Sequence, residues 1–230
     1  MDRDAMRAFA AVAMAGGFAL SADAASLTEV PRATWAGSVT LPSYVKMYVY
    51  VPDKLATKPP IVVSNHSCGS SASGQMGNLP KMKALADKNG FLMILPDNPG
   101  QNCWDVGTKQ ALAHDGGGDP HAVATMVRYA LKKYGADSSR VYVVGGSSGG
   151  MMTQALAGIY PEIFVAAAPR AGVACGCWAE SYATANQWSG PCSGGTVSKT
   201  AQVWGDYVRA INLTCTPDAG HNDQVGLCDD

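Results

Sequence analysis

Charged side chains are scarce in this sequence: Asp, Glu, Lys and Arg make up 15% of its 230 residues, against about 25% in an average globular domain. The 17 basic and 18 acidic residues nearly cancel, leaving a formal net charge of −1. This balance predicts no basic surface for nucleic acid or an anionic membrane, so we expect neither as a partner. The hydrophobic share of 47% excludes intrinsic disorder for most of the chain.

Long hydrophobic runs are also lacking, and none reaches the about 20 residues that span a membrane. The most extended run, residues 8–20, lies near the N-terminus and is followed by small residues at Ala22 and Ala24. An apolar run closed by an A-x-A pattern is typical of a secretory signal peptide, although two acids precede it here. We therefore expect residues 1–24 to be a signal peptide and the protein to be secreted and extracellular. An N-terminal core helix is the alternative.

Cysteine pairs with C-x-x-C spacing are absent, which argues against a zinc site. Seven cysteines in a secreted chain predict disulfides plus at least one unpaired thiol. Of two glycosylation sequons, the one at Asn212 is the expected glycan site, because the other, at Asn65, follows a predicted buried strand. The cysteines are Cys68, Cys103, Cys175, Cys177, Cys192, Cys215 and Cys228.

One group of potential metal ligands consists of His114, Asp115, Asp119 and His121. We favour ordinary loop and capping roles for these residues. Asp119 followed by Pro120 is typical of a helix N-cap and its first helical residue, and the three glycines within the group make a poor scaffold for ligands. The sequence therefore predicts no metal site.

From residue 44 onward, runs of strand-forming residues alternate with stretches of helical spacing. This alternation predicts one α/β domain with a mostly parallel sheet and helices on both faces. Functional residues are then expected on loops after the carboxyl ends of the strands. Strands are predicted at 44–51, 61–63, 91–95, 141–144 and 163–168. Helices are predicted at 79–88, 120–134, 151–159 and 200–211, and long loops at 97–118 and 175–196.

The strongest functional signal is the Gly-Gly-Ser-Ser-Gly-Gly turn at residues 145–150, between a predicted strand and a predicted helix. G-x-S-x-G in this context is the nucleophile elbow of α/β-hydrolases, which lifts a serine hydroxyl above the sheet. Two registers fit, and we favour Ser147 as the nucleophile, with the N–H of Ser148 as an oxyanion donor. A plain glycine-rich turn is the alternative. A dinucleotide fingerprint fails because it requires glycine at position 147.

A second signal, at residues 63–71, follows the predicted strand at 61–63. Serine hydrolases place their other oxyanion donor after this strand, so the backbone N–H of Ser67 or Cys68 is a candidate. His66 lies in the same loop. Because the base for the nucleophilic serine comes later in such chains, we predict that His66 orders the loop instead.

Five motifs, taken together, make the sequence resemble a known family. They are His66–Ser70, Asn102–Asp105, Arg140–Gly150, Tyr160–Phe164 and Trp204–Arg209. The chain resembles, over roughly residues 30–211, the secreted fungal esterases of carbohydrate esterase family 1, which belong to the poly(3-hydroxybutyrate) depolymerase-like esterases. The resemblance implies an α/β-hydrolase domain at residues 25–211. It also implies a cofactor-free serine esterase that acts on plant cell-wall esters.

The resemblance also implies roles for single residues. The family's nucleophile matches Ser147, and its HGCG-type loop matches residues 66–69, with Ser67 in the usual place of a glycine. Cys68 and Ser148 then supply the oxyanion amides. The implied disulfides are Cys68–Cys103 and a bridge from Cys175 or Cys177 to Cys192.

The C-terminal sequence departs from the family pattern. The family supplies an Asp and then a His after the nucleophile, each following a further strand, whereas residues 212–230 contain no apolar strand and no G-x-A-D motif. His221 is the only histidine after Ser147. We therefore expect 212–230 to be a divergent tail of a truncated product that lacks the last two strands. The expected result is a weak catalyst with His221 as the one candidate base.

Two functions follow. The first is a secreted, monomeric carboxylic-ester hydrolase that deacetylates xylan, although the sequence leaves acetyl, feruloyl and polyester substrates open. The second is a catalytically impaired homologue or a non-catalytic derivative that binds polysaccharide through Trp178 and Trp188. The alternative for both tryptophans is a purely structural role, in which they cover the core.

Overall fold

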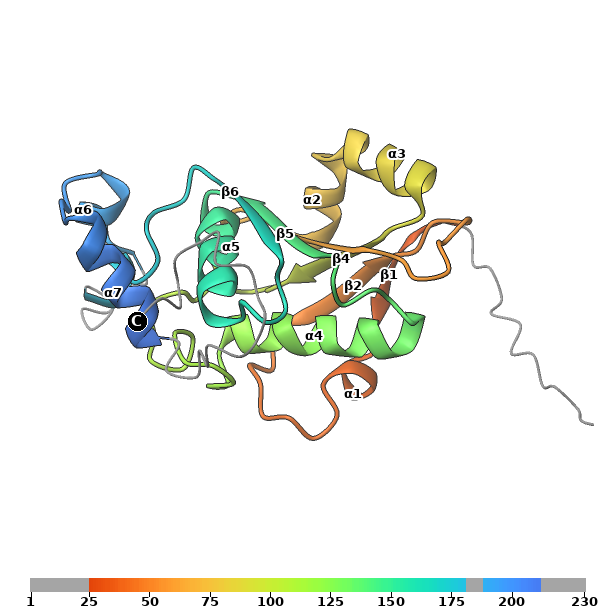
Figure 1. The fold of residues 1–230 in the computed structure, drawn as a ribbon, viewed down its shortest axis with the longest axis horizontal. Helices are drawn as coiled ribbons and strands as arrows, with labels where there is room; N and C mark the ends of the chain where they lie inside the picture. Colours follow the sequence, from red (N-terminus) through yellow and green to blue (C-terminus); the bar gives the residue numbers. More distant parts are fainter. Residues whose placement is uncertain (1–24, 181–187, 212–230) are drawn as a thin grey trace, which may run out of the picture.

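The computed structural model describes residues 25–180 and 188–211 (Figure 1). The predicted signal peptide at 1–24 and the tail at 212–230 lie outside the described residues, and so do Asn212 and His221. Within the described part, no helix is long and apolar enough to cross a membrane.

The sheet is mixed and mostly parallel, with the strand order β1-β2-β4-β3-β5-β6. The four strands from β4 to β6 in this order pair in parallel, as expected, whereas β1 and β2 pair antiparallel at one side. The strands are β1 Leu27–Val30, β2 Lys46–Tyr50, β3 Ile61–Asn65, β4 Leu92–Asp97, β5 Val141–Gly146 and β6 Ala166–Arg170. The alternation of strands and helices in the sequence does not reveal these antiparallel strand pairs, and β1 was not predicted.

Helices cover both faces of the sheet, as predicted (Figure 1). The helix pair α2 and α3 packs on one face, whereas α1, α4 and α5 pack on the other. The helices are α1 Arg32–Trp35, α2 Ala72–Gly77, α3 Pro80–Asn89, α4 Asp119–Tyr134, α5 Ser148–Ile159, η1 Cys177–Glu180, α6 Gly190–Ser193 and α7 Ala201–Ile211.

Strand β4 shows how one buried strand serves two cores. Leu92 and Ile94 belong to the large core beneath α4 and α5, whereas Met93 and Leu95 belong to a smaller core beneath α2 and α3. All four side chains are fully buried. Since successive side chains of a strand point to opposite faces, a continuous apolar run is what a doubly covered strand requires.

Helix α4 begins one residue earlier than predicted. Its N-cap is Gly118, and Asp119 is already helical. The Asp119 carboxylate does not cap the helix, because it accepts hydrogen bonds from the Tyr44 hydroxyl (2.8 Å) and from the backbone N–H of Asp105 (3.0 Å). The predicted capping role of Asp119 is therefore wrong.

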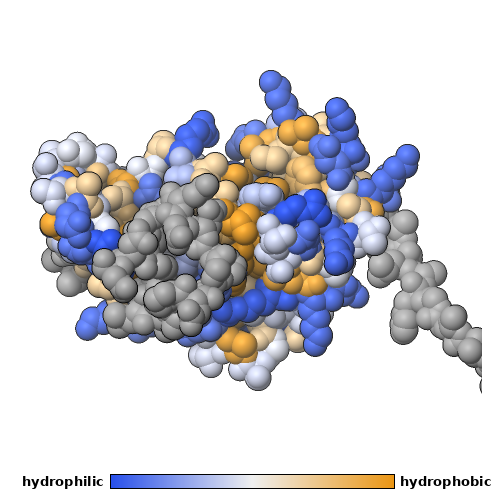
Figure 2. All heavy atoms as spheres, viewed as in Figure 1, coloured by the Kyte–Doolittle hydropathy of each residue, from blue (hydrophilic) through white to orange (hydrophobic). Residues whose placement is uncertain are grey.

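The strand predicted at 163–168 lies at 166–170 instead. Ile163 and Phe164 are buried in a turn, where both backbone N–H groups donate to the Tyr160 carbonyl oxygen. Their apolar side chains thus fill the core below the end of α5 rather than a strand. Every residue of β6 is exposed because β6 is the last strand of the described sheet. Figure 2 shows apolar surface near the centre of this face of the molecule.

Candidate active site

Ser147 occupies a strained turn between β5 and α5. Its backbone has φ 56° and ψ −124°, a left-handed conformation that non-glycine residues rarely adopt. The residue is exposed, whereas the neighbouring Ser148 is fully buried and its hydroxyl accepts a hydrogen bond from the backbone N–H of Trp104 (2.8 Å). Such strain clusters at functional sites. The G-x-S-x-G motif fits the sequence with either Ser147 or Ser148 at its centre. Of these two serines, Ser147 is the exposed one at the turn.

The glycines around Ser147 allow backbones to approach more closely than side chains would. A Cβ atom at Gly149 would lie 2.2 Å from the carbonyl oxygen of Asn65, and one at Gly145 would lie 2.2 Å from the carbonyl oxygen of Gly149. Real Cβ contacts are never this short. The two positions therefore accept only glycine without movement of the backbone, which explains why the turn is so glycine-rich.

Hydrogen bonds and a disulfide hold the loop after β3, which carries Cys68, next to this turn. The Ser67 hydroxyl donates to the carbonyl oxygen of Gly146 (3.1 Å), and the indole N–H of Trp104 donates to the carbonyl oxygen of His66 (2.9 Å). A disulfide joins Cys68 to Cys103. The structure thus brings the two predicted oxyanion segments, residues 66–69 and the start of α5, to one edge of the sheet.

His66 is buried under this loop, and both of its ring nitrogens face polar partners. Nδ1 lies 2.8 Å from the Ser67 carbonyl oxygen, Nε2 lies 3.5 Å from Asp97 Oδ1, and the ring packs on Trp104 with centroids 4.7 Å apart. Burial raises the pKa of Asp97, but the neighbouring His66 ring and the backbone N–H groups of Ala72 and Asn98 outweigh it, so the net pKa is lowered. These contacts fit the predicted loop-ordering role.

The other described histidines are also engaged. His114 Nε2 lies 2.9 Å from Glu162, and His121 Nε2 lies 3.3 Å from Asp115, whose other contacts include Arg128. Asp119 is turned towards Tyr44 and burial raises its pKa to about 6. Among residues 25–180 and 188–211, no three His, Cys, Asp or Glu side chains form a group suited to a metal ion.

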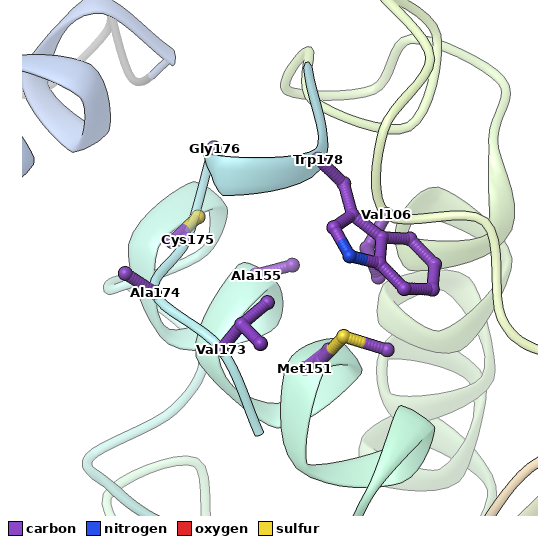
Figure 3. A pocket seen from close by; sticks show the side chains of 8 residues that line it. All are labelled: Val106, Met151, Ala155, Val173, Ala174, Cys175, Gly176 and Trp178. Carbon is purple, nitrogen blue, oxygen red and sulfur yellow. The ribbon is translucent and has the colours of Figure 1, made fainter. Parts of the chain in front are cut away.

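The segment after β6 contains the second disulfide and a small apolar pocket against α5. Cys177 pairs with Cys192, which settles the alternative that the sequence left open, and Cys175 has no disulfide partner among the described residues. Figure 3 shows that Cys175, Trp178 and Met151 face this pocket. Burial raises the pKa of the Cys175 thiol to about 12, so this thiol is unreactive at neutral pH.

The two tryptophans of this segment differ in exposure. Trp178 is buried, whereas Trp188 is 52% exposed. Their rings meet edge to face with centroids 5.2 Å apart. Trp178 therefore covers the core, which was the alternative to sugar binding, whereas Trp188 presents an aromatic surface to the solvent.

Sequence reasoning missed one group that positions the turn, the backbone carbonyl of Arg170 at the end of β6. It accepts a hydrogen bond from the Ser147 N–H. A backbone carbonyl leaves no signal in the sequence, so only the strand register could identify it.

A mostly parallel sheet with helices on both faces and a strained serine turn between β5 and α5 defines an α/β-hydrolase. A family model described as Esterase PHB depolymerase matches residues 43–189. The chain belongs to this family.

Named relatives agree with this assignment. The chain is 44% identical over 171 residues to a probable acetylxylan esterase A from Aspergillus fumigatus, covering 74% of this chain and 46% of the relative. It is 48% identical over 170 residues to feruloyl esterase B from Thermothelomyces thermophilus, covering 73% and 58%. The chain thus spans about half the length of the curated relatives it matches. The solved acetyl xylan esterase from Aspergillus awamori has a TM-score of 0.75 and 38% identity, covering 83% of this chain and 68% of that one.

Proposed function

We propose that this protein is a serine carboxylic-ester hydrolase with Ser147 as its nucleophile. The observation that carries the proposal is the exposed Ser147 hydroxyl on a strained turn at the N-terminus of α5. Such a turn presents a serine hydroxyl above the carboxyl edge of the sheet, where substrate can reach it.

The proposed reaction follows from the groups around this turn. The Ser147 oxygen attacks the ester carbonyl, and the backbone N–H groups of Ser148 and Cys68 stabilise the negative charge on the carbonyl oxygen. The alcohol leaves with a proton, and water then hydrolyses the acyl-enzyme. A histidine has to accept the serine proton. His221 is the candidate, since the three described histidines are bound to other groups.

The proposed substrates are esters of plant cell-wall polysaccharides, first of all acetylated xylan. The support comes from relatives named acetylxylan esterase and feruloyl esterase, which match more than 70% of this chain. We further propose that the protein is secreted as a monomer after removal of residues 1–24 and carries a glycan at Asn212.

A fluorophosphonate probe tests the nucleophile directly, because it labels only an activated serine. We expect one label, located by peptide mapping on Ser147, and none on Ser147→Ala. The matched control is Ser139→Ala, which removes an exposed hydroxyl that bonds to Asp137. Labelling of any other serine, or none, rejects the proposal.

Non-catalytic polysaccharide binding is the second candidate, favoured by the half-exposed ring of Trp188. A sugar ring stacks on such a surface, and Trp178 supports it from below. Co-sedimentation with insoluble xylan tests it: Trp188→Ala should release the protein, whereas Leu85→Ala, which removes an equally exposed apolar side chain from α3, should not. Equal retention of both variants excludes this role.

A further inference from the structure

A second concave site lies away from the serine turn. It is an open cleft of about 470 Å³, within the roughly 300–1,000 Å³ range of small-molecule sites. The loop after β4 forms one side with Lys109, the segment of Gly176 and Ala179 forms another, and α7 closes it with Tyr207 and Ala210. Its described lining includes no residue of 145–150 or 66–69. We call it the Lys109 cleft.

The walls of the Lys109 cleft are mainly small and apolar, and two of its elements contribute a glycine to the lining, Gly107 and Gly176. Gly176 has φ +80°, and a Cβ there would lie 3.3 Å from the Tyr207 side chain. Glycine at these places keeps the cleft free of protruding side chains. A thin, flat and apolar body matches such walls better than a branched one.

The aromatic wall is already fixed in position. The Tyr207 ring packs edge to face with Trp204, with centroids 5.7 Å apart, and the Lys199 ammonium lies 5.2 Å from its centroid. An aromatic wall held on several sides loses little conformational freedom when a ligand binds. Aromatic ligands also gain from ring contacts beyond the burial of their area.

The charge of the cleft is positive. Lys109 is exposed and has no ion-pair or hydrogen-bond partner among the described residues. Two acids that neighbour lining residues in the sequence have other partners: Asp105 accepts hydrogen bonds from the Thr108 hydroxyl and from the N–H of Gly107, and Asp206 pairs with Arg209. An ammonium at the rim of an apolar cleft complements a ligand with one anionic end.

We propose that the Lys109 cleft binds a monoaromatic carboxylate, with its ring between the apolar walls and its carboxylate at Lys109. This binding site is separate from the Ser147 turn and goes beyond the proposed hydrolase function. The ligand is a free acid with no ester to cleave. Its binding is therefore measured without turnover. The result tests the binding proposal independently of the hydrolase assignment.

Isothermal titration calorimetry on the full chain tests the proposal with trans-cinnamate as the probe. Cinnamyl alcohol has the same ring without the charge, and acetate has the charge without the ring. We expect saturable binding of cinnamate, weaker binding of the alcohol and none of acetate. Lys109→Gln should weaken cinnamate binding about three- to fivefold, the scale of an exposed ion pair, and leave the alcohol unchanged. Lys133→Gln, an exposed lysine on α4, is the matched control.

A second variant fills the cleft itself. Ala179 is exposed, so Ala179→Trp adds an indole without disturbing the core, and it should weaken both aromatic ligands at least about tenfold. Cinnamate binding that survives Ala179→Trp places the ligand elsewhere and overturns the proposal. So does equal binding to the parent and Lys109→Gln. A dimer in sedimentation velocity that Ala179→Trp abolishes assigns the cleft to a second copy, which also overturns it.

Discussion

The backbone N–H of Ser147 donates a hydrogen bond to the carbonyl oxygen of Arg170, at 2.9 Å. This bond ties the serine turn to the end of β6, and a Cβ at Gly150 would lie only 2.5 Å from the same oxygen. Because the Ser147 amide is used in this way, it is not available to an oxyanion. The next amide, of Ser148, begins α5 and has no partner within the helix, which supports its proposed role as an oxyanion donor.

The first prediction concerns the close packing of Gly149 against the backbone of Asn65. Gly149→Ala should lower the free energy of unfolding by about 3 kcal/mol or more, at the upper end of overpacking effects, because the contact is with backbone that cannot rotate away. Gly77→Ala is the control, since a Cβ there meets nothing within 4 Å, and it should change stability by less than about 1 kcal/mol. Urea denaturation measures both; equal stabilities would contradict the packing argument.

The second prediction concerns the Cys68–Cys103 disulfide, which closes a loop of 35 residues. Replacing both cysteines by alanine should lower the free energy of unfolding by roughly 3–4 kcal/mol, because the unfolded chain regains the freedom of that loop. The Cys177–Cys192 bridge has a separation of 15 and should be worth about 3 kcal/mol. Denaturation of the two double variants tests this order, and non-reducing peptide mapping should recover both bridges.

Structural features that depend on a few adjacent residues were predicted from the sequence, whereas features that depend on tertiary packing were not. The serine turn and the end of α3 at Gly90, with φ +68°, are set by a few adjacent residues, and both were predicted. Helix α2 is not among the predicted helices, because its sequence is Gly- and Ser-rich, yet Ser71 caps it and Ala72 is buried in the smaller core beneath α2 and α3. Tertiary packing there overrides propensity.

The candidate site shows the same division. The segments near Ser147 and Cys68 follow from strand–turn patterns, because the carboxyl ends of parallel strands meet at one edge. The pairing of Cys192 with Cys177 rather than Cys175 could not be predicted from such patterns. The two cysteines are only two positions apart, and only the directions of their side chains in the folded chain distinguish them. Strand β1, with only Val30 buried, also lacked a pattern strong enough to detect.

The third prediction uses the buried Asp119, whose pKa burial raises to about 6. The unfolded value is about 3.9, so the folded protein binds more protons between about pH 4 and pH 6. The free energy of unfolding should therefore fall by about 2–3 kcal/mol as pH rises through this window. Asp119→Asn has no charge to bury and should remove this slope.

The matched control for that slope is Asp137→Asn. Asp137 has a pKa lowered to about 2 by hydrogen bonds from Ser139 and Arg140, so it titrates below the window. Urea denaturation at pH 4, 5, 6 and 7 gives the three slopes. If Asp119→Asn and the parent have the same slope, another group is responsible.

The fourth prediction concerns secretion. N-terminal sequencing of extracellular protein should begin at Ala25 or within a few residues of it, because the apolar run at 8–20 ends before small residues at 22 and 24. Val12→Arg places a charge in that run and should keep the protein inside the cell. Extracellular protein that still begins at Met1 or Met6 would refute the signal peptide.

The last prediction concerns the proton acceptor for Ser147, for which His221 is the candidate. A serine hydroxyl is a weak nucleophile until an imidazole within about 2.6–3.2 Å accepts its proton. His221 lies in a polar segment without a predicted strand to position it. We therefore expect weak turnover of p-nitrophenyl acetate, with the parent less than about 10³-fold above Ser147→Ala, compared with about 10⁶-fold for a complete triad.

His221→Ala should fall to the same rate as Ser147→Ala, because a nucleophile and its base act as a unit and losing either costs as much as losing both. His114→Ala is the control, since its ring pairs with Glu162, and it should keep the parent rate. A parent rate far above 10³-fold over both variants would refute weak catalysis and establish His221 as the base. A parent rate equal to that of Ser147→Ala would instead refute the hydrolase proposal.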